Sequence, residues 1–187
     1  MSKFKYYIFN KPFGVLCQFT KEMPNHITLK DYLDLASDIY PIGRLDKDSE
    51  GLLLLTNDNK YKHNILSPDS YKTKSYWVQV DGQITENAIA DLINGVKIKL
   101  KKNYYHTQKC TAHIIDGPVV WERIPPVRVR KSIPTSWLSI TISEGKNRQV
   151  RKMCAAVGFP VLRLIRYEIN GILLDDLPIG DFKEFFL

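Results

Sequence analysis

Residues 43–57 read Gly-Arg-Leu-Asp-Lys-Asp-Ser-Glu-Gly-Leu-Leu-Leu-Leu-Thr-Asn, which joins a densely charged turn directly to an apolar strand. Five of the eight residues from Arg44 to Gly51 are charged, and four consecutive leucines follow. A short apolar run bounded by turn residues is typical of a buried strand. The run therefore places one carboxylate, Asp46, in a turn just before a core strand.

Asp46 has two interpretations at this point. Turns before strands are commonly charged and exposed, so Asp46 can be an ordinary solvated carboxylate. Alternatively, an arginine beside it would keep the carboxylate ionised and orient it for nucleophilic attack. A helix predicted over about 147–157 offers such a partner, because Arg148, Arg151 and Lys152 give it a cationic face.

The same helix also has an apolar face. Apolar side chains recur there at i, i+3, i+4 and i+7, which is the spacing of one helix face. They are Val150, Met153, Cys154 and Val157. Gly158 stands where a helix commonly ends, and Pro160 prevents its continuation. One side of the helix is expected to pack and the other to face solvent or an anion.

Strand and helix patterns are mixed along the chain without a fixed repeat, which is typical of an α+β protein. Strands are expected at 5–9, 15–19, 52–56, 75–80, 97–100, 112–115, 137–142 and 161–169. Thr28 and Asp31 form a capping-box pattern that predicts a helix through Leu35. Thr85 predicts a second helix that stops at Asn94.

Positive charge concentrates in one part of the chain. The net charge is +7 over 187 residues, but residues 1–100 carry only +1 and residues 167–187 carry −4. Residues 101–166 carry +10. Such a segment is either a solvated surface or the binding surface for a polyanion such as a nucleic acid.

Three cysteines without a C-x-x-C pair and four scattered histidines indicate neither a disulfide framework nor a structural zinc site. No apolar run approaches the length of a membrane helix, and the first residues have no signal-peptide pattern. We therefore expect a protein of the reducing cytoplasm, without a membrane anchor.

Prolines interrupt the segment between Ile124 and Ser136, which marks a possible internal boundary. Basic side chains concentrate in the same segment; they include Arg123, Arg128, Arg130 and Lys131. The segment is either a solvated loop or a basic arm that becomes ordered on contact with phosphates.

Five motifs together resemble the RsuA/RluB/RluE/RluF family of ribosomal RNA pseudouridine synthases, and the resemblance covers nearly the whole chain. The motifs are 10–14 (Asn-Lys-Pro-Phe-Gly), the run 43–57, 74–76 (Lys-Ser-Tyr), 142–153 (Ile-Ser-Glu-Gly-Lys-Asn-Arg-Gln-Val-Arg-Lys-Met) and 161–166 (Val-Leu-Arg-Leu-Ile-Arg). A bare Arg-Leu-Asp is weak, but the long run 43–57 followed about 90 residues later by 142–153 is specific. With the resemblance, the catalytic interpretation of Asp46 becomes the preferred one.

The resemblance implies an RNA pseudouridine synthase with Asp46 as the nucleophile and Arg151 as its basic partner. Tyr76 matches the family tyrosine that stacks on the target uracil, although by spacing it is also a plausible core aromatic. Arg44 matches the arginine beside the nucleophile, which can hold or replace a flipped nucleotide. Further RNA-binding candidates are Arg148, Lys152, Arg163, Arg166, Arg128, Arg130 and Lys131.

The fold implied by the resemblance has a mixed, largely antiparallel sheet with flanking helices and a central basic cleft. We expect residues 1–187 to form one catalytic domain with two subdomains around that cleft, without the N-terminal S4 domain of most family members. The expected substrate is one uridine of large-subunit (23S) ribosomal RNA. We expect a monomer that needs no cofactor and no metal.

Two alternatives stay open from the sequence. The enzyme can act instead on transfer RNA or small-subunit ribosomal RNA. A member of another class, a non-catalytic RNA-binding protein of ribosome assembly, can keep the same fold.

Overall fold

The chain forms two compact units. A computed structural model describes residues 4–67, 72–128, 130 and 132–187, so the predicted RNA-binding residue Lys131 lies outside the described residues. Unit 1 combines residues 1–72 with 166–187, and unit 2 spans residues 73–165. The proline-rich segment between Ile124 and Ser136 lies inside unit 2 and is not a boundary, because its prolines interrupt a loop between two strands of that unit.

Unit 1 is built around a buried strand. Its elements are β1 (Tyr6–Lys11), a 3-10 turn (Leu29–Asp31), β2 (Tyr40–Pro41), β3 (Glu50–Thr56), α1 (Asn59–Leu66), β10 (Ile172–Leu173) and β11 (Phe182–Glu184). The strand order β11-β1-β3 places β1 between two antiparallel neighbours. All seven residues of β3 are buried, which explains the four consecutive leucines, since a strand covered on both faces needs no polar alternation.

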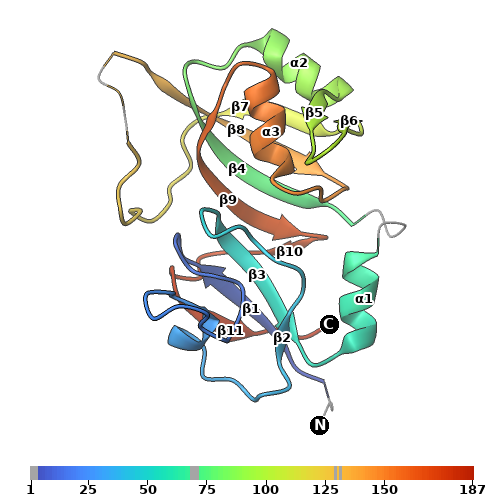
Figure 1. The fold of residues 1–187 in the computed structure, drawn as a ribbon, viewed down its shortest axis with the longest axis vertical. Helices are drawn as coiled ribbons and strands as arrows, with labels where there is room; N and C mark the ends of the chain where they lie inside the picture. The colour runs from blue at the N-terminus through green and yellow to red at the C-terminus, as the bar shows by residue number, and fades with distance from the viewer. Residues whose placement is uncertain (1–3, 68–71, 129, 131) are drawn as a thin grey trace. The chain divides into compact units, whose positions relative to one another are not determined.

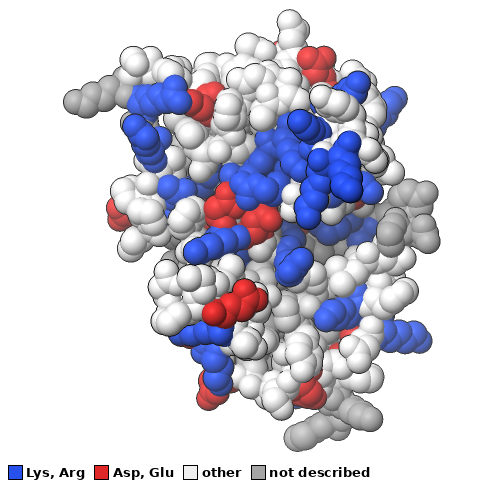
Figure 2. Space-filling view, in the orientation of Figure 1, with Lys and Arg blue, Asp and Glu red and all other residues white. Residues whose placement is uncertain are grey.

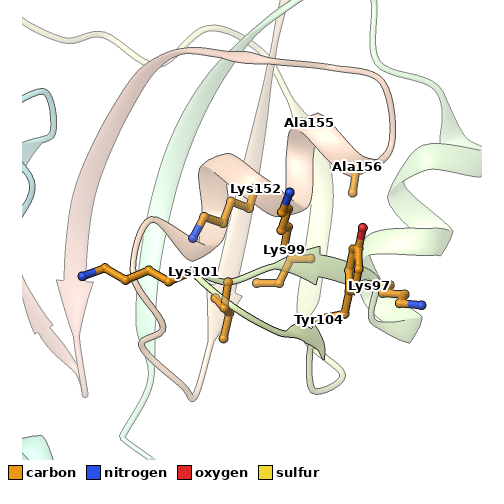
Figure 3. A pocket seen from close by; sticks show the side chains of 9 residues that line it. Lys97, Lys99, Lys101, Tyr104, Lys152, Ala155 and Ala156 are labelled. Atoms are coloured by element: carbon orange, nitrogen blue, oxygen red, sulfur yellow. The ribbon is translucent and has the colours of Figure 1, made fainter.

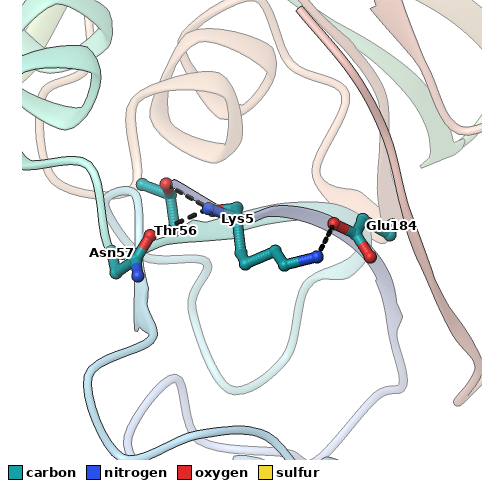
Figure 4. Close-up of polar contacts among 4 residues, drawn as sticks. All are labelled: Lys5, Thr56, Asn57 and Glu184. Atoms are coloured by element: carbon teal, nitrogen blue, oxygen red, sulfur yellow. Dashed lines mark hydrogen bonds and ion pairs between the residues drawn. The ribbon is translucent and has the colours of Figure 1, made fainter. Parts of the chain in front are cut away.

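Lys5, which lies just before β1, contacts both neighbours of that strand, β3 and β11 (Figure 4). The backbone N–H of Lys5 donates to Asn57 Oδ1 at 2.9 Å, and Thr56 Oγ1 donates to the Lys5 carbonyl at 2.7 Å. The Lys5 ammonium pairs with Glu184 Oε1 at 2.7 Å. Because this ion pair is half exposed, it contributes little stability and mainly marks the register of β1 against its neighbours.

Unit 2 places two helices on one face of an antiparallel sheet (Figure 1). Its elements are β4 (Lys74–Asp81), α2 (Glu86–Asn94), β5 (Lys97–Lys99), β6 (Tyr104–His106), β7 (Thr111–Ile115), β8 (Thr135–Ile142) and α3 (Gln149–Ala156). β9 (Val161–Ile169) begins in unit 2 and ends in unit 1. The strand order is β9-β4-β8-β7, and β5 pairs with β6 as a separate hairpin.

Alternate residues of β4 and β8 form the core of unit 2. They are Tyr76, Val78 and Val80 of β4 and Leu138, Ile140 and Ile142 of β8. Residues of both helices join the same cluster, including Leu92 of α2 and Met153 of α3. Because all these strand residues share one face, both helices must cover that face.

Most predicted elements are confirmed, two local expectations are wrong, and one helix was not expected. The strand expected at 15–19 is an irregular segment with one isolated bridge, Leu16 to Thr28. The helix expected from Thr28 through Leu35 is only the 3-10 turn Leu29–Asp31. Helix α1 was not predicted, since Ile65 is its only buried residue and gives no apolar period.

Candidate active site

In unit 1 the predicted nucleophile lies on the loop that enters β3. Asp46 is half-buried, and Arg44, two residues earlier, is exposed. The Asp46 carbonyl accepts from the Ser49 N–H at 3.0 Å, which closes the turn. Gly14 donates its N–H to the Lys47 carbonyl at 2.8 Å, and its φ of +84° is one that favours glycine. The loop is therefore held from the side by the residues after β1.

A buried cysteine holds the same loop from below. Cys17 Sγ donates to the Leu45 carbonyl and accepts from the Leu45 N–H, both at 3.3 Å. Both polar groups of the residue before Asp46 are thus satisfied by one side chain. Burial raises the pKa of the Cys17 thiol, so the group stays neutral and serves as a structural donor and acceptor.

A completely buried lysine supports the second side of this arrangement. Lys11 is 0% exposed, and its ammonium donates to the carbonyls of Pro12 and Val15 at 2.8 and 2.9 Å. These bonds fix the 12–15 turn that carries Gly14. Burial lowers the pKa of Lys11 to about 8, while the nearby Cys17 and Glu50 side chains oppose the shift.

Arg166 is a buried support in unit 1. Its side chain is 4% exposed, and its Nε donates to the Leu52 carbonyl at 2.9 Å. Its Nη2 is buried without a hydrogen bond. This placement supports a role in fixing β3 and its entry loop.

In unit 2, Tyr76 belongs to the packed face of β4. It is 8% exposed and lies in the core cluster with Val78 and Val80. It pairs across the sheet with Ile140. Tyr76 therefore packs as a core residue, in a cluster that also includes Met153 of α3.

The turn before α3 is fixed by a buried network. Gln149 is 3% exposed; its side-chain oxygen accepts from the Lys146 N–H at 2.9 Å, and its side-chain nitrogen donates to Glu144. Glu144 also accepts from the Tyr105 hydroxyl at 2.6 Å, and this bond raises the pKa of Tyr105. The network determines where the helix begins.

The position at which α3 begins determines where its basic residues lie. Arg148 caps the helix in the left-handed conformation with φ 52° and is exposed. Arg151 and Lys152 are half-buried in the first turn, and the Lys152 ammonium donates to the Asn147 carbonyl at 2.8 Å. The helix begins at Gln149, so Arg148 lies at its N-terminus and not within its cationic face.

The remaining basic candidates of unit 2 differ in depth. Arg163 is 6% exposed, donates to the Trp121 carbonyl at 3.0 Å and stacks over the Trp121 ring at 5.6 Å. Arg128 is exposed. Arg130 is exposed as well and lies 3.6 Å from Asp81. Of these three, Arg128 and Arg130 are available to an RNA backbone, while Arg163 anchors the loop that carries Trp121.

The structure thus brings the predicted residues together in two groups. Unit 1 holds Arg44 and Asp46 on one braced loop, and unit 2 holds Tyr76 in the core cluster to which α3, the helix that carries Arg151, also contributes. The braces themselves were not predicted from the sequence. They are Lys11, Cys17, Glu144 and Gln149. All except Cys17 lie in the motifs quoted above. Their position in these motifs, next to a turn, was the only sequence feature that could have pointed to a supporting role.

The described residues contain neither a cluster of metal ligands nor a helix that could span a membrane. No three of their His, Cys, Asp or Glu side chains gather as a metal site would require. None of the helices in the described ranges is long and apolar enough to cross a membrane.

Comparisons with known proteins agree on one family. The sequence model described as RNA pseudouridylate synthase matches residues 5–156. A ribosomal large subunit pseudouridine synthase E from Vibrio parahaemolyticus is 49% identical over 180 residues, covering 96% of this chain and 73% of the relative. A ribosomal small subunit pseudouridine synthase A from Escherichia coli K12 is 34% identical over 182 residues, covering 96% and 69%.

A solved structure gives the same answer for the fold. A crystal structure of a pseudouridylate synthase superposes with a TM-score of 0.80 at 28% identity, covering 100% of this chain and 72% of that one. The α+β fold expected from the sequence is confirmed.

Proposed function

The chain belongs to the RNA pseudouridylate synthase family, and from this premise we propose that it converts one uridine of large-subunit ribosomal RNA to pseudouridine, with Asp46 as the nucleophile. The assignment of large-subunit RNA as the substrate rests on the 49% identity to a large-subunit synthase over 96% of the chain. The small-subunit relative, at 34% identity, is the reason to keep small-subunit RNA as the second candidate.

The reaction rearranges bonds without a co-substrate. The N1–C1′ bond of uridine breaks, the uracil turns, and C5 forms a new bond to C1′. C5 then loses its proton and N1 gains one, so product and substrate have the same composition. A carboxylate suits this chemistry because it can bond to the sugar or the base, or stabilise positive charge as the glycosidic bond breaks.

The braced loop of unit 1 supports the assignment of Asp46. A nucleophile must be held in one geometry, and the carbonyls of Asp46 and Lys47 and both backbone groups of Leu45 are hydrogen-bonded. We assign Arg151 as the cation that keeps Asp46 ionised and Tyr76 as the ring that stacks on the uracil. Both assignments come from the family motifs.

We assign RNA contacts to the accessible basic residues of the proposed track: Arg44, Arg148, Lys152, Arg128 and Arg130. Such contacts supply affinity and register, while the shape of the RNA supplies specificity. Arg163 and Arg166 are buried and are assigned a positioning role. Lys131 stays a candidate outside the described residues. We further propose that this enzyme acts in the cytoplasm and is a monomer.

The decisive experiment compares pseudouridines in all RNAs of cells with and without the gene. Loss of one pseudouridine from large-subunit RNA would support the proposal. Loss of one from small-subunit or transfer RNA would instead identify that RNA as the substrate. An unchanged map would favour the non-catalytic RNA-binding protein.

A further inference from the structure

Unit 2 carries a cationic hollow that the proposed chemistry does not use. It has a volume of about 610 Å³ and lies against the β5–β6 hairpin and α3. The lysine hollow is lined by Lys97, Lys99, Lys101, Tyr104 and Lys152, together with small and apolar residues. No acidic side chain is among the residues that line it.

The hairpin holds its lysines on a rigid support. Strand β5 pairs with β6 so that Ile98 lies opposite Tyr105 and Lys99 opposite Tyr104. Ile98 is 2% exposed and belongs to the core of unit 2, so the alternation of the strand sends Lys97 and Lys99 to solvent. The cations therefore stand on a strand anchored by its buried residue.

An aromatic ring is exposed among these cations. Tyr104 is 65% exposed, and the Lys97 ammonium lies 4.6 Å from the centre of its ring. Figure 3 shows Lys101 and Lys152 extending to the same side of the hollow, with the Tyr104 ring standing beside Lys99. Cations that hold a backbone beside a ring that stacks on bases are the usual components of a single-stranded RNA site.

Two further charged side chains lie near the hairpin. Glu144, which lies next to the hairpin, is engaged by the Tyr105 hydroxyl and the Gln108 N–H at 2.6 and 2.9 Å. Lys146 adds a cation 4.8 Å from the Tyr105 ring. In Figure 2, Lys and Arg side chains gather over the part of unit 2 where Figure 1 shows α3, β5 and β6. A polyanion is the ligand that complements this surface.

We propose that the lysine hollow binds the phosphate backbone of the RNA substrate away from the target uridine, with Tyr104 stacking on one unpaired base. The proposal rests on the RNA substrate of the proposed function and extends it to a second contact region. Lys97, Lys99, Lys101 and Tyr104 thereby become RNA-binding residues, joined to the proposed track by Lys152, which lines the hollow.

The test is the triple variant Lys97→Gln, Lys99→Gln and Lys101→Gln, with the triple variant Lys21→Gln, Lys30→Gln and Lys60→Gln in unit 1 as the charge control. Binding to large-subunit ribosomal RNA from cells lacking the gene is measured by filter binding between 50 and 200 mM salt. Turnover is measured as tritium release from C5-labelled uridine in the same RNA. Thermal unfolding shows that each variant is folded.

We expect the triple variant to bind roughly 10-fold or more weakly at 0.1 M salt, with a salt slope smaller by about 2. KM should rise by a similar factor while kcat at saturating RNA is retained, and Tyr104→Leu should weaken binding at every salt concentration. Wild-type affinity and slope in the triple variant, or an equal loss in the charge control, would overturn the proposal. Absent turnover by wild type would defeat the proposed function instead, and the binding comparison would still judge the hollow.

Discussion

Replacing the buried lysine under the nucleophile loop, Lys11→Met, should change both stability and catalysis. Methionine keeps the length and apolar character of the side chain but removes its charge and its bonds to the carbonyls of Pro12 and Val15. In the native protein, burial lowers the pKa of Lys11 from 10.5 to about 8. In the unfolded chain the pKa of this lysine returns to its usual value.

The sign follows from proton binding. Between pH 8 and 10.5 the unfolded chain keeps the proton of Lys11 while the folded chain has lost it, so the wild-type free energy of unfolding rises with pH. One pKa unit corresponds to about 1.4 kcal/mol, so the full difference approaches about 3 kcal/mol. Below pH 8 both states are protonated and the contribution is constant. The Lys11→Met variant lacks this group and should not show the increase.

The assay is chemical denaturation of wild type and Lys11→Met at several values between pH 7 and 10.5. Groups common to both proteins cancel in the difference, and the exposed Lys60→Met serves as the matched control. A difference that stays flat across this range would refute the lowered pKa of Lys11 in the folded protein. The variant should also lose about 10- to 100-fold in kcat, because the 12–15 turn no longer holds the Asp46 loop.

Three further predictions test the braces and the charge. Burial raises the pKa of Cys17, of Cys110 to about 11 and of Cys154 to about 12, so iodoacetamide at pH 8 should label all three slowly in the folded protein and rapidly after unfolding, as read by mass spectrometry. Glu144→Gln removes the carboxylate charge, which strengthens the hydrogen bond that raises the pKa of Tyr105, so 13C-tyrosine NMR should show that pKa falling toward its ordinary value, with a lower kcat. If six basic residues neutralise phosphates, RNA affinity should fall about 10³-fold between 50 and 200 mM salt, and a flat response would remove the basic track.

The sequence predicted the elements whose signals are local. Helix α3 and strand β9 carry clear apolar patterns and were placed within a few residues. The 15–19 segment misled because Val15 and Cys17 are buried as braces of a loop and not as a strand. Burial alone looks the same in the sequence whichever backbone conformation produces it.

For the candidate site, the sequence predicted which residues are candidates but not which of them are buried. Arg163 and Arg166 look like surface cations by composition, yet both are buried on a strand covered on its two faces. Lys11 was quoted within a motif but received no role, because a charged residue is expected at the surface. Long-range contacts such as Gly14 to Lys47 decide these positions, and no local pattern encodes them.

The most direct measurement uses Asp46→Asn, which keeps the size of the side chain and removes its charge. Cells carrying this variant in place of the wild-type gene should lack the same single pseudouridine of large-subunit ribosomal RNA that is absent when the gene is deleted. The purified variant should release no tritium from C5-labelled uridine while its RNA affinity stays within about twofold of wild type. Wild-type levels of that pseudouridine in the cells that carry Asp46→Asn would contradict the assignment of Asp46 as the nucleophile.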